Sequence, residues 1–240
     1  MRSNRHIAAA VLALLAGAAA ANAQTMSAPE SIKIKHITKD FAIGALDNAA
    51  WSAASVVEVE TYWSGRPAPR SRHFSVRMLW SDTSLYVRFE AGQHEPLVVS
   101  DRPDTSKKTL QLWDRDVCEI FIAPDRERPR RYFEFEVAPT GEWIDLSIEI
   151  APDGKRTTDW DYASGMRSSA RIEKNKVVMA MRVGWKALGR EPKAGDIWLG
   201  NLFRCVGRDP DRGYLAWRPT LTEKPNFHVP EKFGEFVFED

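Results

Sequence analysis

The chain of 240 residues is 43% hydrophobic, 28% charged and 10% aromatic, which supplies apolar material for one sizeable core and too little for two. Its 34 basic and 33 acidic side chains leave a formal net charge of +1, which excludes a polybasic nucleic-acid binder and an acidic tail protein. The two cysteines exclude a disulfide-dense framework and a four-thiolate zinc site. A single domain is therefore expected.

The N-terminal residues 1–23 have the pattern of a secretory signal peptide. Two arginines precede an apolar run at residues 7–21, and the small residues needed for cleavage follow at residues 21–23, Ala-Asn-Ala. The apolar run is shorter than the roughly 20 residues that span a bilayer, so a membrane anchor is less favoured. We predict cleavage after Ala23, which leaves residues 24–240 as a single exported domain, periplasmic or secreted, with no transmembrane span.

Most of the remaining chain alternates apolar and polar residues with a period of two, which is typical of strands with one buried face. The runs at residues 73–80 and 84–90 are separated by turn residues and predict a hairpin. Its expected core residues are Phe74, Val76, Met78, Leu85, Val87 and Phe89. Further runs of this kind lie at residues 117–122, 132–137, 143–150, 177–183, 197–205 and 236–238.

These strands predict an all-β fold. Only residues 185–189 look like a helical turn, closed by Gly189, and no alternation of strands and helices suggests a parallel sheet. A two-sheet antiparallel β-sandwich of jelly-roll type with one short helical turn fits best.

Common catalytic signatures are absent from the sequence, including the nucleophile elbow, the phosphate-binding loop, the dinucleotide fingerprint and the zinc-protease motif. The histidines of the expected mature chain are isolated and are interpreted as solvated or capping residues: His36, His73, His94 and His228. Cys118 and Cys205 lie in predicted strands among apolar neighbours, which favours buried free thiols over a disulfide. We therefore do not expect an enzyme.

Paired carboxylates keep one catalytic alternative open. Glu134 and Glu136 are two residues apart on a predicted strand, on one face and about 7 Å apart, which is within the range of a glycosidase pair. Asp116 and Glu119 form a second candidate pair. Alternating acids on a solvent-facing sheet surface are ordinary, so a glycoside hydrolase is the less favoured hypothesis.

An aromatic residue next to polar groups points to sugar binding. A sugar ring has C–H faces and a rim of hydroxyls, so its site needs a flat aromatic surface with carboxylates or guanidinium groups at the edge. Residues 113–116, Trp-Asp-Arg-Asp, combine these groups and follow a polar stretch. Composition alone leaves two readings of Trp113 open: an exposed platform, or a core residue like Trp80 and Trp198.

Four segments, taken in order, resemble the carbohydrate-binding module family 9-like domains. They are residues 112–122 (LWDRDVCEIFI), 132–143 (YFEFEVAPTGEW), 195–204 (GDIWLGNLFR) and 226–234 (NFHVPEKFG), and residues 48–51 and 84–89 match as well. The resemblance covers nearly all of the expected mature chain. It implies a β-sandwich, related to the DOMON-like domains, that binds sugars without cleaving them and often accompanies xylan-degrading enzymes.

The resemblance also implies a set of sugar-binding residues. Trp113 corresponds to an aromatic platform of the family's sugar binders, and Glu119 to a carboxylate that accepts hydrogen bonds from sugar hydroxyls. Phe227, followed by His228, stands where binders with two platforms have Trp, and Glu136 stands where they have a basic residue. One hydrogen-bond donor of the family site has thus become an acceptor.

The favoured function is that of an exported, non-catalytic carbohydrate-binding protein that supports xylan-type or glucan-type catabolism. Its expected ligand is an oligosaccharide or a polysaccharide end, and its expected partner is a separate glycoside hydrolase. No cofactor is predicted, but the resemblance implies that structural calcium can occur in loops, where Asp101, Asp104 and residues 209–211 supply oxygen ligands.

The alternative from a different class is a DOMON-like haem-binding electron-transfer domain. Candidate axial ligands are Met78, Met179, Met181 and His228. The sequence has no Cys-x-x-Cys-His attachment motif, and the methionines alternate as core residues do.

Overall fold

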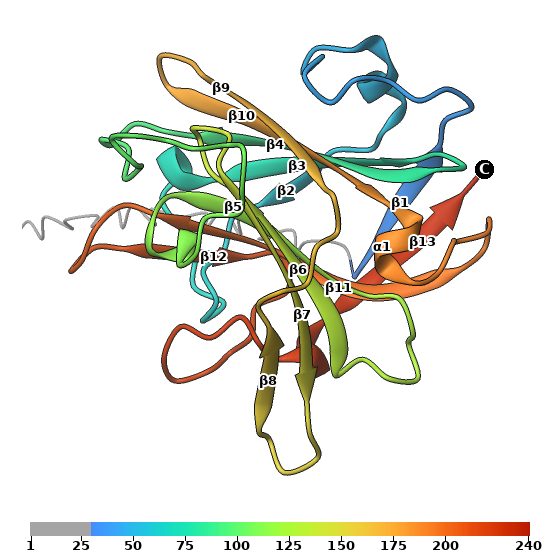
Figure 1. Cartoon of the computed structure of the whole chain (residues 1–240). Coiled ribbons are helices and arrows are strands. Elements are labelled where there is room, and N and C mark those ends of the chain that lie inside the picture. Colours follow the sequence, from blue (N-terminus) through green and yellow to red (C-terminus); the bar gives the residue numbers. More distant parts are fainter. Residues whose placement is uncertain (1–29) are drawn as a thin grey trace, which may run out of the picture.

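The computed structural model describes residues 30–240 of the chain (Figure 1). The predicted signal peptide, residues 1–23, lies outside the described residues. Most elements are strands: β1 (Ser31–His36), β2 (Val57–Val59), β3 (Phe74–Trp80), β4 (Ser84–Gly92), β5 (Val117–Ala123), β6 (Arg131–Val137), β7 (Trp143–Ile150), β8 (Arg156–Asp159), β9 (Arg167–Ile172), β10 (Lys176–Gly184), β11 (Ile197–Val206), β12 (Gly213–Ala216) and β13 (Gly234–Glu239).

Helical structure within residues 30–240 is short. It comprises α1 (Trp185–Leu188) and four 3-10 turns: η1 (Ala49–Ala53), η2 (Arg70–Arg72), η3 (Leu112–Asp114) and η4 (Pro230–Lys232). The helical turn predicted at residues 185–189 is confirmed, and Gly189 ends it with a φ of 66°, a left-handed conformation that glycine adopts without strain. None of these helices has the length and hydrophobicity needed to cross a bilayer.

The strands are hydrogen-bonded in the order β8-β7-β6-β5-β11-β13-β1-β3-β4-β10-β9, with β12 added beside β11 and β2 beside β3. This sheet curls so that β5 and β6 pack over β3, β4 and β10 (Figure 1), which confirms the predicted all-β sandwich class. Most pairs are antiparallel. The first strand, β1, departs from this pattern because it lies parallel to both β13 and β3 and joins the two halves.

The predicted hairpin is β3 and β4, whose register pairs Val76 with Phe89 and Met78 with Val87. All six of its expected core residues are at most 2% exposed, as predicted. The expectation that only one face of the hairpin is buried is wrong. Tyr86 points to the other face and is fully buried there, stacked on Phe41 under the segment that includes η1.

The main core lies between the two halves of the sandwich and contains Trp80 and Trp198 as expected. The three methionines proposed as haem ligands, Met78, Met179 and Met181, are also buried in this core. His228 lies against a second apolar cluster, on the outer face of β5. Since the methionines and the histidine point to different faces of the sheet, they do not form a pair of axial ligands.

The second apolar cluster covers the outer face of β5, β6, β7 and β11. Along β5, Cys118, Ile120 and Ile122 point into the main core, whereas Val117 and Phe121 belong to the outer cluster. Every residue of β5 is buried, because this outer face is covered instead of open to solvent. Glu119 shares the outer face through the same two-residue alternation and is therefore buried as well.

Candidate functional site

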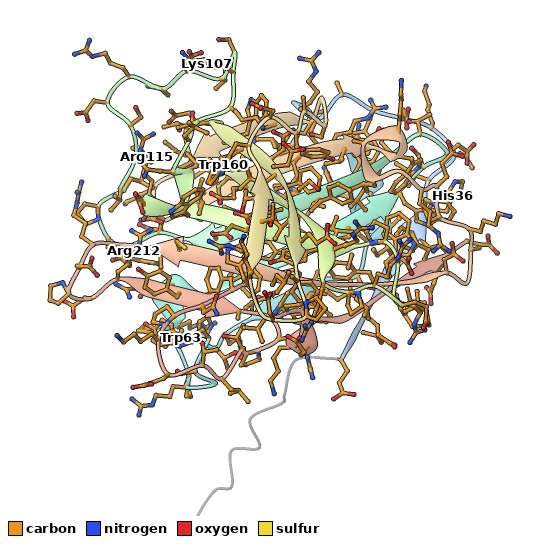
Figure 2. All side chains as sticks on the ribbon, turned by 60° about the horizontal axis from the view of Figure 1, so that its bottom comes forward. His36, Trp63, Lys107, Arg115, Trp160 and Arg212 are labelled. Atoms are coloured by element: carbon orange, nitrogen blue, oxygen red, sulfur yellow. The ribbon has the colours of Figure 1, made fainter. Side chains whose placement is uncertain are left out.

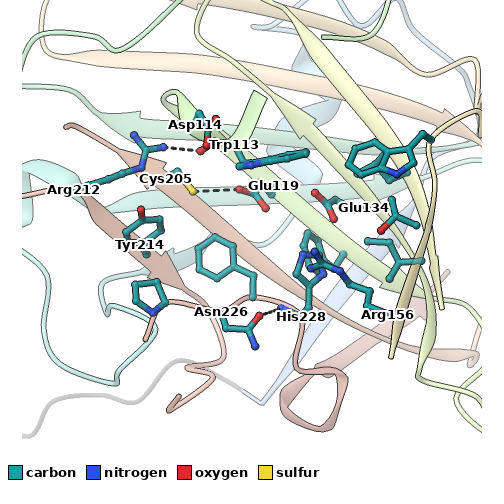
Figure 3. Close-up of a pocket in the computed structure, with 17 residues that line it drawn as sticks. Trp113, Asp114, Glu119, Glu134, Arg156, Cys205, Arg212, Tyr214, Asn226 and His228 are labelled. Atoms are coloured by element: carbon teal, nitrogen blue, oxygen red, sulfur yellow. Dashed lines mark hydrogen bonds between the residues drawn. The ribbon is translucent and has the colours of Figure 1, made fainter. Parts of the chain in front are cut away.

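A pocket of about 360 Å³ opens on the outer face of β5, β6 and β7. Its size falls within the range of small-molecule sites. Side chains reach it from η3, β5 to β8, β11, β12 and residues 225–228. Figure 3 shows Trp113 on one side, Asn226 and His228 on the other, and Glu119 and Glu134 between them.

Trp113 is held at the pocket by its short 3-10 turn. The turn begins after Gln111, whose φ of 57° is left-handed, and Leu112 anchors it in the outer apolar cluster. Arg212 donates hydrogen bonds of 2.7 Å to the carbonyls of Trp113 and Arg115. The indole of Trp113 is half-buried at the pocket wall, so it is not a core residue of the kind that Trp198 is.

Trp160, which directly follows β8, extends this aromatic surface. Its ring lies 6.1 Å from that of Trp113 at an angle of 45°, and it is 48% exposed. A large apolar side chain left open to solvent beside a pocket is available for ligand contact. Figure 2 shows Arg115, Trp160 and Arg212 toward one end of the molecule and His36 at the other.

The opposite wall contains Phe227, which stacks on the buried ring of Phe203 with centroids 4.1 Å apart and planes 10° apart. Tyr214 meets Phe227 edge-on at 6.2 Å. One face of the Phe227 ring is thus used in packing. The ring is half-buried and still lines the pocket.

His228 follows on the same wall. Its Nδ1 lies 2.8 Å from the Tyr132 hydroxyl, and its backbone N–H donates to Oδ1 of Asn226. Burial, helped by the positive charge of Arg156, lowers the pKa of His228 to about 3. The imidazole is therefore neutral at neutral pH and offers hydrogen bonds without charge.

Three buried glutamates form the floor and the layer behind it. Glu119 on β5 is the direct cross-strand partner of Glu136 on β6, and Glu134 is opposite Phe121, the next outward-facing position of β5. Their exposures are 2%, 0% and 3% for Glu119, Glu136 and Glu134. One carboxylate oxygen of each lies within 4.8 Å of the others. Glu119 and Glu134 line the pocket, whereas Glu136 lies behind them.

Burial raises the pKa of all three carboxyl groups, because the charged form loses its hydration. Mutual repulsion adds to this for Glu119, which faces the charge of Glu134, and for Glu136, which faces both. The Cys205 thiol donates to Oε1 of Glu119 at 3.4 Å. Three such groups titrate as a unit, so the cluster retains protons at higher pH than isolated glutamates do.

Four of the five predicted sugar-binding residues meet at this pocket: Trp113, Glu119, Phe227 and His228. Glu136 does not line it, because its position on β6 places it under Glu119. The contact of these residues with sugar stays a prediction. Sequence reasoning missed Arg156, Trp160 and Asn226, although Asn226 begins one of the matched segments and an exposed Trp after a polar strand is itself a signal.

Neither of the two candidate carboxylate pairs has the arrangement of a glycosidase pair. Asp116 does not face the pocket with Glu119: it accepts hydrogen bonds from the backbone N–H groups of Val98 and Gly207. Glu134 and Glu136 share a face as predicted, but a glycosidase pair must flank the bond it cleaves, and Glu136 has no access to the pocket.

The cysteines are buried free thiols, as favoured from the sequence, with Cys118 in the main core and Cys205 at the pocket. Within residues 30–240, the three glutamates are the one group of acidic, histidine or cysteine side chains close enough together to share a metal ion. The acids expected as calcium ligands do not form such a group: Asp101, Asp104, Asp209 and Asp211.

Comparisons with known proteins agree with the fold and with the resemblance. The model of the family described as carbohydrate family 9 binding domain-like matches residues 43–240. A protein from Bacteroides uniformis, provisionally described as carbohydrate-binding, is similar in structure, with a TM-score of 0.69 at 16% identity over 87% of this chain and 99% of the other. No curated protein matches the chain.

Two structures of a family 9 carbohydrate-binding module from Caldicellulosiruptor kristjanssonii are also similar. The complex with cellotriose has a TM-score of 0.61 at 15% identity, over 87% of this chain and 93% of the other. The complex with glucose has a TM-score of 0.60 at 14% identity, over 87% and 95%. At these identities the likeness establishes the fold.

Proposed function

The chain belongs to the carbohydrate family 9 binding domain-like family, and we propose that it is an exported, non-catalytic protein that binds the end of an oligosaccharide in the pocket between Trp113 and Phe227. A role in carbohydrate binding follows from the family. The choice of this pocket, the stacking mode and the export are the parts that we propose.

One observation carries the choice of pocket: aromatic rings and a hydrogen-bond acceptor line the same hollow. Trp113 and Trp160 offer ring surface on one wall, and Phe227 offers it on the other. Glu119 lies between these walls (Figure 3) and can accept hydrogen bonds from hydroxyls at the rim of a stacked sugar. A pyranose ring requires this combination, because its C–H faces stack on aromatic rings and its hydroxyls need hydrogen-bond partners.

Polar groups at the edge of the pocket complete the proposed site. Arg156 and the Asn226 amide supply donors for sugar oxygens, and the neutral His228 ring supplies one more polar contact. Affinity should be modest, because a small polar ligand must lose its hydration and pair its hydroxyls again in the pocket.

A binding role fits the carboxylates better than hydrolysis does. A hydrolase needs one acid on each side of the scissile bond, whereas Glu119 and Glu134 sit together at the pocket floor. We therefore propose that any cleavage of the glycan is carried out by a separate glycoside hydrolase acting on xylan-type or glucan-type chains.

Isothermal titration calorimetry tests the proposal. The Caldicellulosiruptor module was solved with cellotriose and with glucose, so these two and xylotriose are the first ligands, each also with its sugar end reduced. Trp113→Ala should abolish binding. Trp63→Ala, which removes an indole from a separate hollow, is the matched control and should bind as the unmodified protein does. Unchanged binding by Trp113→Ala would place the site elsewhere.

A further inference from the structure

Ion pairs neutralise two of the other buried acids of residues 30–240, whereas none neutralises the glutamate cluster. Glu142 pairs with Arg115 at 3.2 Å, and Asp145 pairs with Lys108 at 2.7 Å. No such ion pair reaches the three glutamates within the described part of the chain. Burial and mutual repulsion keep protons on this cluster while the pocket is empty, so a cation that enters it would favour their loss and pair with the carboxylates that form.

Several oxygens of the cluster also lack hydrogen-bond donors. Oε2 of Glu134 and both carboxylate oxygens of Glu136 are buried with no donor from any other residue of the described chain, and these two carboxyl groups are close enough to share a proton. Leaving a buried acceptor unpaired destabilises a protein, and more so when the group is charged. Glu134 lines the pocket as well, and its other carboxylate oxygen, Oε1, is the one that a donor entering the pocket can reach.

The spacing of the oxygens suits an ammonium group. Such a group has three N–H donors, and three acceptors placed tetrahedrally at about 2.8 Å from its nitrogen are about 4.6 Å apart. One oxygen of each of Glu119, Glu134 and Glu136 lies within 4.8 Å of the other two, so the carboxylates of Glu119 and Glu134, which line the pocket, are close enough to accept from one ammonium group. A cation at this position pairs with Glu119 and Glu134 directly and gains from the charge of Glu136 behind them.

The two cationic side chains at the pocket leave this floor free. Arg212 is engaged by the carbonyl oxygens of Gly207, Trp113 and Arg115 and stacks over Tyr214. Arg156 is exposed on β8 and makes no ion pair with the cluster, although its charge lowers the pKa of Glu134 as it does that of His228.

We propose that the pocket selects amino sugars: the sugar ring stacks on Trp113 and Phe227, and its ammonium group binds Glu119 and Glu134. This inference rests on the proposed function, because the same rings hold the sugar. It goes further by assigning the class of ligand. Glu136 stands where the family's sugar binders have a basic residue, and in this proposal its carboxylate helps to attract a cation.

Calorimetry with three matched trimers at near-neutral pH tests this selection. Cellotriose, the trimer of glucosamine and the trimer of N-acetylglucosamine differ at one substituent of each ring, and of the three only the glucosamine trimer is cationic. We expect the glucosamine trimer to bind at least about tenfold more tightly than either neutral trimer, which corresponds to about 1.4 kcal/mol. The preference should weaken at high ionic strength.

Isosteric variants test which glutamates give rise to the preference for the glucosamine trimer. Glu134→Gln keeps the shape of the floor and removes charge, so the preference should fall to about threefold or less. Glu136→Gln, whose side chain does not reach the ligand, should reduce it in part. Glu149→Gln is the control, because Glu149 is exposed on β7, pairs with Arg131 and lies off the pocket. It should keep the full preference.

Equal affinities for the three trimers would overturn the inference and leave the proposed function standing. Binding of none of them would overturn both. If calcium or manganese raised the affinity for cellotriose while the amino trimer showed no advantage, the cluster would be a metal site and the inference would be wrong. The comparison of trimers on the unmodified protein does not depend on whether any variant folds.

Discussion

Glu119 and Glu136 are directly opposite each other on the paired strands β5 and β6, and both carboxyl groups are buried. Like charges in this position destabilise a sheet, and burial raises the pKa of both groups. The pair is therefore expected to hold a proton at pH values where isolated glutamates are ionised. Ionising the pair lowers the free energy of unfolding, and this loss of stability can be measured.

Glu136→Gln should stabilise the protein, and more at about pH 8 than at about pH 5. A carboxyl whose pKa is raised on folding binds more protons folded than unfolded, so stability falls as pH rises above the unfolded value of about 4.3. Glutamine does not titrate and escapes this loss. Thermal melting of both proteins across this pH range measures it, with an expected gain of about 1–3 kcal/mol at the upper end. Glu149→Gln should show no such gain, since Glu149 is exposed and its pKa is lowered by Arg131.

The fold was largely predictable because its central strands alternate with a period of two. The runs at residues 117–122, 143–150 and 197–205 correspond to β5, β7 and β11. Strands β8 and β9 gave no such signal, since they are mostly polar and exposed at the edges of the sheet. Edge strands bury little apolar surface, so their sequences are under weaker constraint.

The candidate site was predictable in part. Trp113, Glu119 and Phe227 came from a family resemblance, and the structure brings them to one pocket. The acids of β6 were interpreted as a solvent-facing row, because alternation shows which residues share a face but not what covers it. Residues 225–228 help to cover this face of β6, and they lie nearly a hundred positions after it in the sequence. The burial of Tyr86 was missed for the same reason.

Export can be checked directly. Two arginines, the apolar run at residues 7–21 and the small residues before Gln24 predict cleavage after Ala23. Mass spectrometry of the protein recovered from the periplasm or the medium should find Gln24 at the N-terminus. Recovery of a form that still begins at Met1 would contradict the prediction.

Trp113→Ala and Trp198→Ala should differ sharply in stability. Trp198 is fully buried between the sheets, where its ring lies 4.8 Å from that of Phe238, so its removal leaves a cavity and should cost about 3–5 kcal/mol. Trp113 is half-buried at the pocket wall, and its truncation should lower the melting temperature only slightly. Denaturant unfolding of both variants measures the difference. Similar losses would mean that Trp113 packs as a core residue.

Phe227→Trp should tighten sugar binding. Phe227 already rests flat on Phe203, so a larger ring in the same orientation would extend the stacking surface over the pocket. An additional aromatic contact of this kind contributes about 0.5–1.5 kcal/mol, which is about a two- to tenfold gain in affinity for cellotriose. Calorimetry measures this gain, and the melting temperature shows whether the indole fits.

Phe227→Leu serves as the paired control, because leucine still packs on Phe203 but offers no flat face, and it should weaken binding. The two variants should therefore move affinity in opposite directions while stability changes little. If both bound cellotriose as the unmodified protein does, with melting temperatures unchanged, the pocket face of Phe227 would not contact the sugar. A weaker affinity for Phe227→Trp together with a lower melting temperature would instead show that the indole cannot adopt the stacked orientation, and the second platform would then be limited to a ring of phenylalanine size.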